Sequence, residues 1–405
     1  MSKPNPAVSI IIPNYNHAQY VGDAIDSVLN QTYTDYEVIV VDDGSRDNSR
    51  EVIDAFGDKV RAIYQQNQGL SAARNTGINA ARGRYIGVLD ADDMYEPDFL
   101  ETLVSALESR PDADGIYCGY RFVDHLNNPL PQVEAREVAP EKLYQALVDG
   151  NFLVPESMFV RKYCYDKVGP FDTSLRALED FDMWLRITSQ FKIIYTTKVL
   201  TRHRILPGSM STDPTRQHQN RMSVVKKHFG AEPISGGVWS DAQRRAYGRA
   251  YLVSAVEYLQ AHNEVRAYEC VYAMVNAYPG LLAQMETFYE LGCGEQPKGF
   301  RGEFASVDID QNYPVVMRLL EKLSHAPELR EFRKLKRIAY ANAHYAFGLL
   351  AYGQGNSKAA RQFFLAAVRY HPRFILDRAL TGFLLRSVVG AKLIRRFKQL
   401  RGKTA

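Results

Sequence analysis

The chain of 405 residues has few cysteines, and no pair of them has the spacing of a metal site. The four, Cys118, Cys164, Cys270 and Cys293, are spread widely and suggest no disulfide framework. We therefore expect a reduced, cytoplasmic chain. The sequence also lacks an apolar run of about 18 residues, so no membrane-spanning helix is expected. The run from Val8 to Ile12 is too short for a signal peptide.

The charge balance has no strong sign overall, with a formal net charge of +4. We expect no nucleic-acid partner. The positive charge is concentrated at the end, because residues 373–405 contain nine Lys or Arg against one acid, which gives +8 and leaves −4 for the remainder. A hydrophobic content of 46% and a charged content of 24% are ordinary for a globular protein. The length predicts two or three domains.

Strand and helix patterns alternate over the first part of the chain, which predicts a parallel sheet in an α/β domain. Strands are expected at 8–12, 37–41, 60–64, 84–89 and 115–122, with helices at 20–29, 49–56, 69–81 and 97–107. Beyond these we expect a loop at 127–140, a helix at 141–147, irregular or extended chain at 152–160, a helix at 180–188 and a strand at 192–197.

Polar residues follow four of these strands at their carboxyl ends. They are Asn14, the pair Asp42 and Asp43, the segment 65–68, and the pair Asp90 and Asp92. In open α/β sheets ligands bind at this edge, so a site is expected there. A Gly-rich phosphate loop with Lys or Arg is missing after the first strand, where Pro13-Asn-Tyr-Asn16 stands instead, and this disfavours a nucleotidyltransferase.

The segment Tyr85-Ile-Gly-Val-Leu-Asp90-Ala-Asp92-Asp93 ends a buried strand in three acids. Asp90 and Asp92 point to the same side of an extended chain, where they repel each other unless a cation or a set of donors lies between them. Oxygen ligands of this kind suit Mg²⁺ or Mn²⁺. The alternative is a solvated acidic turn.

Two further charged groups are ambiguous on local pattern alone. Arg74, on a helix, offers a fork of donors for a base carbonyl or a phosphate, or it is simply a solvated arginine. Asp180, near a helix start, can accept a proton from a hydroxyl, or it serves only as a helix cap. The apolar pattern favours a core position for Trp184 over a sugar platform.

After about residue 215 the pattern becomes helical throughout. Segments 250–279 and 341–372 each pair two short helices around a polar turn and resemble tetratricopeptide repeats, the second more closely. Two such units fall short of the roughly three that an independently stable solenoid needs.

Five motifs occur in the order SIIIPNYN, VVDDGS, NQGLSAARNTGI, YIGVLDADD and ALEDFDMWLR. Together, over about residues 7–212, they resemble the inverting glycosyltransferases of family 2, which have a GT-A fold. The resemblance implies an α/β, Rossmann-like GT-A domain at 1–215, followed by an all-α region at 216–372 and a basic tail at 373–405.

The resemblance also implies roles in binding a nucleotide-sugar donor, with a UDP-sugar expected. Pro13, Tyr15 and Asp43 would line the base pocket, and Asp43 would accept the uracil N–H. Arg74 would approach the base or the phosphates, and Asp90 would hold the ribose hydroxyls.

The same resemblance implies that Asp92 ligates Mn²⁺ or Mg²⁺ and that Asp180 is the catalytic base. Glu179 and Trp184 would support the acceptor pocket. The acceptor expected is a hydroxyl of a glycan or of a lipid-linked glycan in cell-surface polysaccharide synthesis. The alternative is a scaffold protein with a catalytically silent sugar-nucleotide domain, which the intact acidic pairs disfavour.

The sequence departs from the family pattern at one place. Family members often have a further metal-ligating His just before a Gly-Ser-x-Ser stretch, and here Leu206 stands at that position. Either His203, three residues earlier, reaches the metal, or the metal has one protein ligand fewer; we favour the second.

The tail, from Phe374 to Leu400, mixes apolar and basic residues in a pattern typical of an amphipathic helix. Such a helix can lie on an anionic membrane, which would place the protein peripherally at the inner face of the cell membrane. The alternative is a terminal helix packed on the preceding helices.

Overall fold

The computed structural model describes residues 5–206, 208, 212–233 and 237–387. The chain divides into two compact units, residues 1–224 and 225–405. The predicted order, an α/β domain followed by an all-α region, is confirmed. The finer division at residues 215 and 372 stays a prediction.

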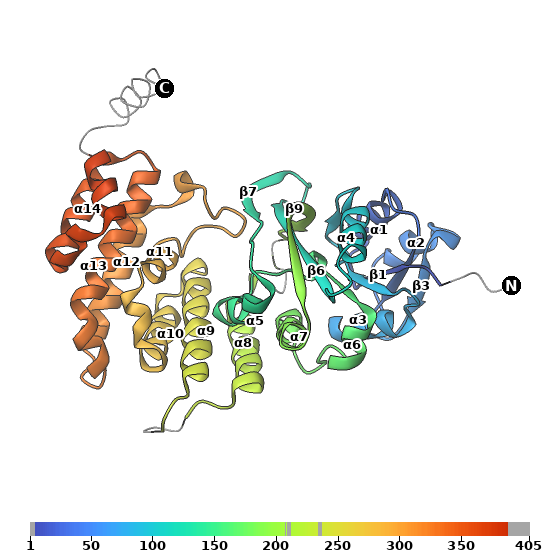
Figure 1. The fold of residues 1–405 in the computed structure, drawn as a ribbon, viewed down its shortest axis with the longest axis horizontal. Helices are drawn as coiled ribbons and strands as arrows, with labels where there is room; N and C mark the ends of the chain where they lie inside the picture. Colours follow the sequence, from blue (N-terminus) through green and yellow to red (C-terminus); the bar gives the residue numbers. More distant parts are fainter. Residues whose placement is uncertain (1–4, 207, 209–211, 234–236, 388–405) are drawn as a thin grey trace, which may run out of the picture. The chain divides into compact units, whose positions relative to one another are not determined.

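The first unit is built on one mixed sheet (Figure 1). Its strands are β1 (Val8–Asn14), β2 (Tyr36–Asp42), β3 (Arg61–Tyr64), β4 (Tyr85–Val88), β5 (Met94–Tyr95), β6 (Gly115–Val123), β7 (Pro129–Glu134), β8 (Met158–Arg161) and β9 (Ile193–Arg204). Its helices are α1 (Val21–Leu29), α2 (Ser49–Asp54), α3 (Leu70–Ala80), α4 (Phe99–Glu108), α5 (Pro140–Asp149), α6 (Lys162–Val168) and α7 (Glu179–Thr188). A further helix, α8 (Pro214–Phe229), follows β9.

The strand order is β3-β2-β1-β4-β8-β6-β9-β5, and β7 pairs with β6. The first four strands are parallel to one another, as predicted, and β6 is parallel to β9. The complete sheet is mixed, because β8, β7 and β5 each run antiparallel to their neighbours.

The segment 127–140, predicted to be a loop, contains the edge strand β7. The prolines of β7, at 129 and 131, favour a loop when only the local sequence is considered. Proline is nevertheless tolerated on an edge strand, which has a partner on one side only. The segment 152–160, predicted to be irregular or extended, contains the start of β8.

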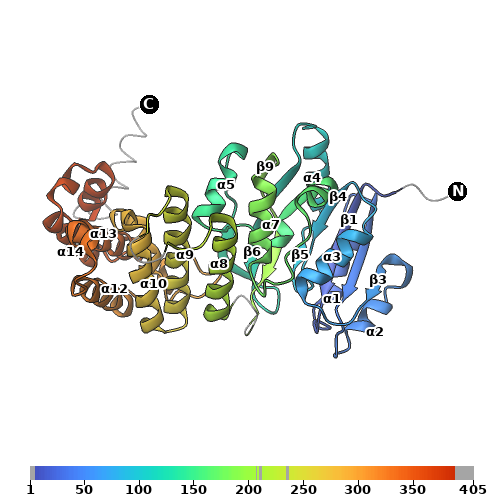
Figure 2. The ribbon, with the colours of Figure 1, turned by 90° about the horizontal axis from the view of Figure 1, so that it is seen from below.

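β1 lies between β2 and β4 in the sheet, and all seven of its residues are buried. A strand of a parallel sheet is apolar throughout when both faces are covered. Figure 2 shows α1 and α3 beside β1. The buried residues of α1 are Val21, Ala24, Ile25 and Val28, the spacing of one helical face, so this helix covers the sheet with an apolar stripe.

The second unit is helical over its described residues. Its helices are α9 (Asp241–Gln260), α10 (Glu264–Ala277), α11 (Met285–Gly292), α12 (Ile309–Ser324), α13 (Arg330–Gly353) and α14 (Ser357–Tyr370). Asparagine side chains cap the second helix of both predicted hairpins: Asn263 accepts from the N–H of Arg266, and Asn356 accepts from that of Ala359. The polar turn in each hairpin thus satisfies a free helix N–H.

Gly348 explains why the two helices of the second hairpin approach closely. A Cβ at this position would lie 2.4 Å from Phe364 of α14, so a larger residue would push the helices apart. Of the predicted tail, residues 378–387 are helical, and Leu380 is buried in the same cluster as Phe364. The described start of the tail is therefore packed on the preceding helices, while residues 388–405 lie outside the described part of the chain.

Candidate active site

The carboxyl ends of β1, β2 and β4 meet at one edge of the sheet because these strands are parallel and adjacent. Asn14 is in register with Asp42, and its amide donates to that carboxylate at 2.8 Å. The following loops are also joined, since Ser45 Oγ accepts from the backbone N–H of Asn16 at 2.9 Å. The sequence prediction that polar strand ends gather at one edge therefore agrees with the structure at these positions.

Pro13 and Tyr15 lie at this edge, and their expected part in a base pocket stays a prediction. Pro13 is buried as part of β1, whereas the Tyr15 side chain just beyond it is 40% exposed. Tyr15 precedes Asn16, whose left-handed backbone (φ 55°) turns the chain toward the loop after β2. An exposed aromatic ring beside a polar loop can stack on a planar ligand.

Asp43 is buried and organises the loop between β3 and α3. Its Oδ1 accepts from the Gln65 side chain at 2.7 Å and from the Gln68 N–H at 2.9 Å, while Oδ2 accepts from the Gly69 N–H at 2.7 Å. Gly69 has φ 93°, a conformation that favours glycine. Asp43 therefore fixes the loop at the start of α3, and its expected contact with a base stays a prediction.

Arg74 is fully buried, which rules out the alternative of a solvated arginine. One nitrogen, Nη2, donates to both oxygens of Asp90 at 2.7 and 2.9 Å, and Nη1 donates to Glu179 at 2.5 Å. Although burial opposes a charge, Asp90 and Glu179 raise the pKa of the guanidinium above its usual value. In this structure Arg74 thus pairs with two carboxylates, and its expected approach to the base or the phosphates stays a prediction.

Asp180 lies at the first turn of α7, directly after Glu179. The residue before the helix, Leu178, has a left-handed backbone (φ 60°) that turns the chain into α7. Asp180 Oδ1 accepts from the Phe181 N–H at 2.8 Å. Burial and the neighbouring Glu179 raise the pKa of Asp180 to about 7, against the opposing effect of Arg74. A carboxyl with this pKa can exchange a proton near neutrality.

Trp184 lies in the core and is 0% exposed. Its ring makes an edge-to-face contact with Phe171, at 6.4 Å between centroids. This burial agrees with the core position that the sequence favours for Trp184, and its expected support of an acceptor pocket stays a prediction.

Asp92 is partly buried among other acids. Burial, followed by the charges of Asp93 and Asp90, raises its pKa to about 7. Carboxylates crowded in this way hold their protons until a cation compensates them. The donor chemistry therefore fits a hard divalent cation such as Mg²⁺ or Mn²⁺, whose ligands are oxygen atoms.

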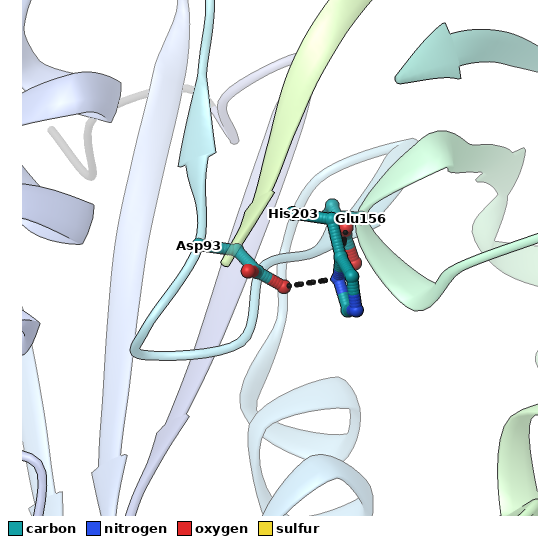
Figure 3. Close-up of side chains that lie close together, drawn as sticks. All are labelled: Asp93, Glu156 and His203. Atoms are coloured by element: carbon teal, nitrogen blue, oxygen red, sulfur yellow. Dashed lines mark hydrogen bonds and ion pairs between the residues drawn. The ribbon is translucent and has the colours of Figure 1, made fainter. Parts of the chain in front are cut away.

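A buried group that the sequence did not predict lies beside this loop: Asp93, Glu156 and His203 (Figure 3). His203 Nδ1 is 3.1 Å from Asp93 Oδ2 and 2.9 Å from Glu156 Oε1. Burial alone would lower the pKa of His203, but these two carboxylates raise this pKa well above its usual value. The ligand atoms lie within 4.8 Å of one another, so the group could also hold a metal ion. His203 was singled out from the sequence only as an open question, and nothing in the local pattern marked Glu156.

Arg204 is another residue that sequence reasoning missed. Its Nε donates to the backbone oxygen of Asp92 at 2.8 Å, and its backbone N–H donates to Asp93 at 2.7 Å. The guanidinium also lies 4.7 Å from the ring centre of Tyr20. Arg204 therefore fixes the acidic loop to the end of β9.

The family model described as glycosyl transferase family 2 matches residues 9–164 of this chain. An uncharacterized glycosyltransferase of Rickettsia prowazekii is 36% identical over 211 residues, which cover 50% of this chain and 64% of that protein. One of Nostoc sp. is 33% identical over 227 residues, covering 54% and 67%. The chondroitin synthase of Escherichia coli is 31% identical over 228 residues, covering 55% and 32%. The chain thus spans less than two thirds of the length of several of these relatives.

Two solved structures have a related shape. S. aureus TarS 1–349 is 18% identical with a TM-score of 0.47, covering 86% of this chain and 91% of that one. The mannosyltransferase PcManGT of Pyrobaculum calidifontis, in complex with GDP-Man and Mn²⁺, is 17% identical with a TM-score of 0.47, covering 84% and 86%. Among the helices that the structure describes, none has the length and apolarity needed to cross a membrane.

Proposed function

Since the chain belongs to glycosyltransferase family 2, we propose that it moves a sugar from a nucleoside-diphosphate sugar to an acceptor hydroxyl, with inversion at the anomeric carbon. The observation that carries the proposal is Asp180 at the start of α7, beside Glu179, which Arg74 joins to Asp90 of the acidic loop. The buried guanidinium of Arg74 thereby links the acidic loop to Glu179, the residue next to the proposed proton acceptor Asp180.

The reaction is a single displacement. Asp180 accepts the proton of the acceptor hydroxyl, and that oxygen forms a bond to the anomeric carbon. The bond from that carbon to the diphosphate oxygen breaks on the opposite side, and the electron pair leaves with the nucleoside diphosphate. A raised pKa suits this role, because a general base acts best when its pKa lies near the working pH.

Asp92 would hold Mn²⁺ or Mg²⁺. When bound, such an ion neutralises charge on the leaving diphosphate. The support is the crowding of Asp92 with Asp90 and Asp93, which together with burial raises the pKa of Asp92 to about 7. Arg204 and the end of β9 hold the backbone of this loop, so the ligand is on a fixed element.

The donor is proposed to be a UDP-sugar. Tyr15, exposed beside Pro13, would stack on the base, and Asp43, which holds the loop before α3 in place, would accept the uracil N–H. Asp90 would bind the ribose hydroxyls with the side of its carboxylate that is not taken by Arg74; its side chain keeps 22% exposure. Arg74 then acts on the donor only through Asp90.

The acceptor is proposed to be a glycan or a lipid-linked glycan in cell-surface polysaccharide synthesis, reached at the cytoplasmic face of the membrane. The support for a membrane partner is the sequence of residues 388–405, which contains six Lys or Arg and no acid. Flotation with anionic liposomes tests it: the full chain should bind, and a chain ending at residue 387 should not. Equal flotation of the two proteins contradicts a membrane role for the tail.

The reaction itself is tested by incubating the protein with a panel of nucleotide sugars, Mn²⁺ and polysaccharide acceptors. We expect free nucleoside diphosphate to appear with one donor and to increase with the right acceptor. No release with any donor, with or without acceptor, would favour the scaffold alternative.

A further inference from the structure

The acidic loop is attached to β9 at two points. Asp93 Oδ1 accepts the backbone N–H of Arg204 at 2.7 Å, and Arg204 Nε donates to the backbone oxygen of Asp92 at 2.8 Å. Immediately after the loop, β5 pairs with β9, with Met94 in register with Arg202. Any shift of the end of β9 therefore moves the backbone that carries Asp92.

His203 adds a third attachment, made by side chains. Its Nδ1 lies between two buried carboxylates, 3.1 Å from Asp93 Oδ2 and 2.9 Å from Glu156 Oε1 (Figure 3). The ring also packs edge-on against Phe122, at 5.5 Å between centroids, and against Tyr120 at 6.2 Å. The imidazole therefore has a defined orientation, with Nδ1 aimed at both acids.

Both carboxylate oxygens of Asp93 have a protein partner. Oδ1 accepts from the Arg204 N–H, and Oδ2 pairs with His203 Nδ1. Its own backbone N–H donates to the carbonyl of Asp90 at 3.0 Å, which closes the turn around Asp92. Two carboxylates as close as those of Asp93 and Glu156 repel each other unless a positive or donating group lies between them. His203 supplies that group, and without it the side of the turn formed by Asp93 loses its fixed position.

We propose that His203, with Glu156 behind it, is a positioning residue that holds the Asp90-Ala-Asp92-Asp93 turn in the geometry needed for Asp92 to bind a divalent cation. The proposal rests on the proposed function, because it takes Asp92 as the metal ligand. Leu206 stands where family members often have a metal-ligating His. Under this proposal His203 does not replace that ligand and instead holds the turn that carries Asp92. Partners that orient a metal ligand typically change metal affinity or activity by about 10- to 100-fold when they are removed.

Two substitutions at one position separate positioning from ligation. His203→Asn places an amide N–H₂ near the position of Nδ1 and can still donate to both carboxylates. His203→Phe keeps a flat ring against Phe122 but has no donor. Calorimetry with MnCl₂ and UDP, without acceptor, measures the cation affinity of each folded protein, and thermal melting confirms folding.

The expected result is a Kd for Mn²⁺ within about threefold of the wild type for His203→Asn and at least about tenfold weaker for His203→Phe. A loss of stability alone would lower the melting temperature of the variant without moving this Kd. If His203→Phe binds Mn²⁺ like the wild type, the proposal is wrong. If both variants lose binding, His203 is a ligand, and the proposal is also wrong.

Glu156 keeps the proposal testable if His203→Phe does not fold. Glu156→Gln retains an oxygen that can accept from His203, whereas Glu156→Ala removes it. Within the described part of the chain, Glu156 Oε2 has no hydrogen-bond partner, so the two variants differ only in the contact with His203. The alanine variant should bind Mn²⁺ several-fold more weakly than the glutamine variant, and equal binding overturns the proposal. Failure of the wild-type protein to bind Mn²⁺ with UDP or any other nucleoside diphosphate instead contradicts the proposed function.

Discussion

Arg74 Nη2 donates to Asp90 Oδ1 over 2.7 Å in a buried ion pair that joins the middle of α3 to the end of β4. The guanidinium is 1% exposed, and its other arm bonds Glu179, 105 residues away in the sequence. Two carboxylates of the candidate active site thus share one cation. A buried charge is stable only when it is paired in this way, so the three residues form a unit.

Arg74→Met should therefore destabilise the protein strongly. It leaves Asp90 and Glu179 without their shared partner, and removing one member of a buried ion pair typically costs about 3–5 kcal/mol. The free energy of unfolding in urea measures this change. The control is Arg110→Met, which removes an exposed pair with Asp112 and should change stability by less than about 1 kcal/mol. Equal effects at the two positions would contradict the role given to Arg74.

Asp180→Asn should abolish most of the transfer while leaving the donor bound. The amide is isosteric but cannot accept the hydroxyl proton, and a general base typically contributes about 10²- to 10⁴-fold in rate. Single-turnover transfer and calorimetric donor binding separate the two effects. Asp166→Asn, an exposed acid on α6, is the matched control and should leave both unchanged. Wild-type turnover in Asp180→Asn would rule out Asp180 as the base.

The rate of transfer should rise with pH through about 7, because Asp180 must lose its proton to act as a base and its pKa is raised to about 7. A profile of kcat/KM from pH 5 to 9 with saturating Mn²⁺ checks this. A rate independent of pH over the range from 5 to 8 would contradict the assignment.

The same raised pKa has the opposite effect on stability. Between about pH 4 and 7 the unfolded Asp180 has released its proton while the folded one keeps it, so the unfolded state binds fewer protons. Stability therefore falls as pH rises through this window. Without metal, the melting temperature of the wild type should fall more steeply from pH 5 to 8 than that of Asp180→Asn. Parallel curves would show that Asp180 titrates at its ordinary pKa.

Sequence patterns predicted the central strands well, because β1 and β2 are apolar runs that end in turn residues. They did not predict the direction of β8, a four-residue strand whose antiparallel pairing with β4 and β6 is set by distant partners. Local patterns specify that a segment is extended, but its neighbours decide how it pairs.

In the candidate site, too, local patterns mark single residues but do not specify their distant contacts. Asp90, Asp92 and Asp180 were predicted as site residues because acids at strand ends and helix starts have local signatures and because their motifs resemble those of the family. The burial of Arg74 was not found, because its partners lie 16 and 105 residues away. Glu156 was missed for the same reason, since its contact with His203 joins segments 47 residues apart.

We propose that this edge of the sheet binds a nucleotide sugar together with a divalent cation held by Asp92. The most direct test is thermal melting of the wild type and Asp92→Asn with UDP-, GDP- and dTDP-sugars, each with and without Mn²⁺. A ligand at 100 times its Kd stabilises the folded state by about 2.7 kcal/mol, a readily measured shift. We predict that at least one donor raises the melting temperature of the wild type in the presence of Mn²⁺ and that Asp92→Asn loses this Mn²⁺-dependent shift. No shift with any donor, or an equal Mn²⁺-dependent shift in both proteins, would contradict the claim.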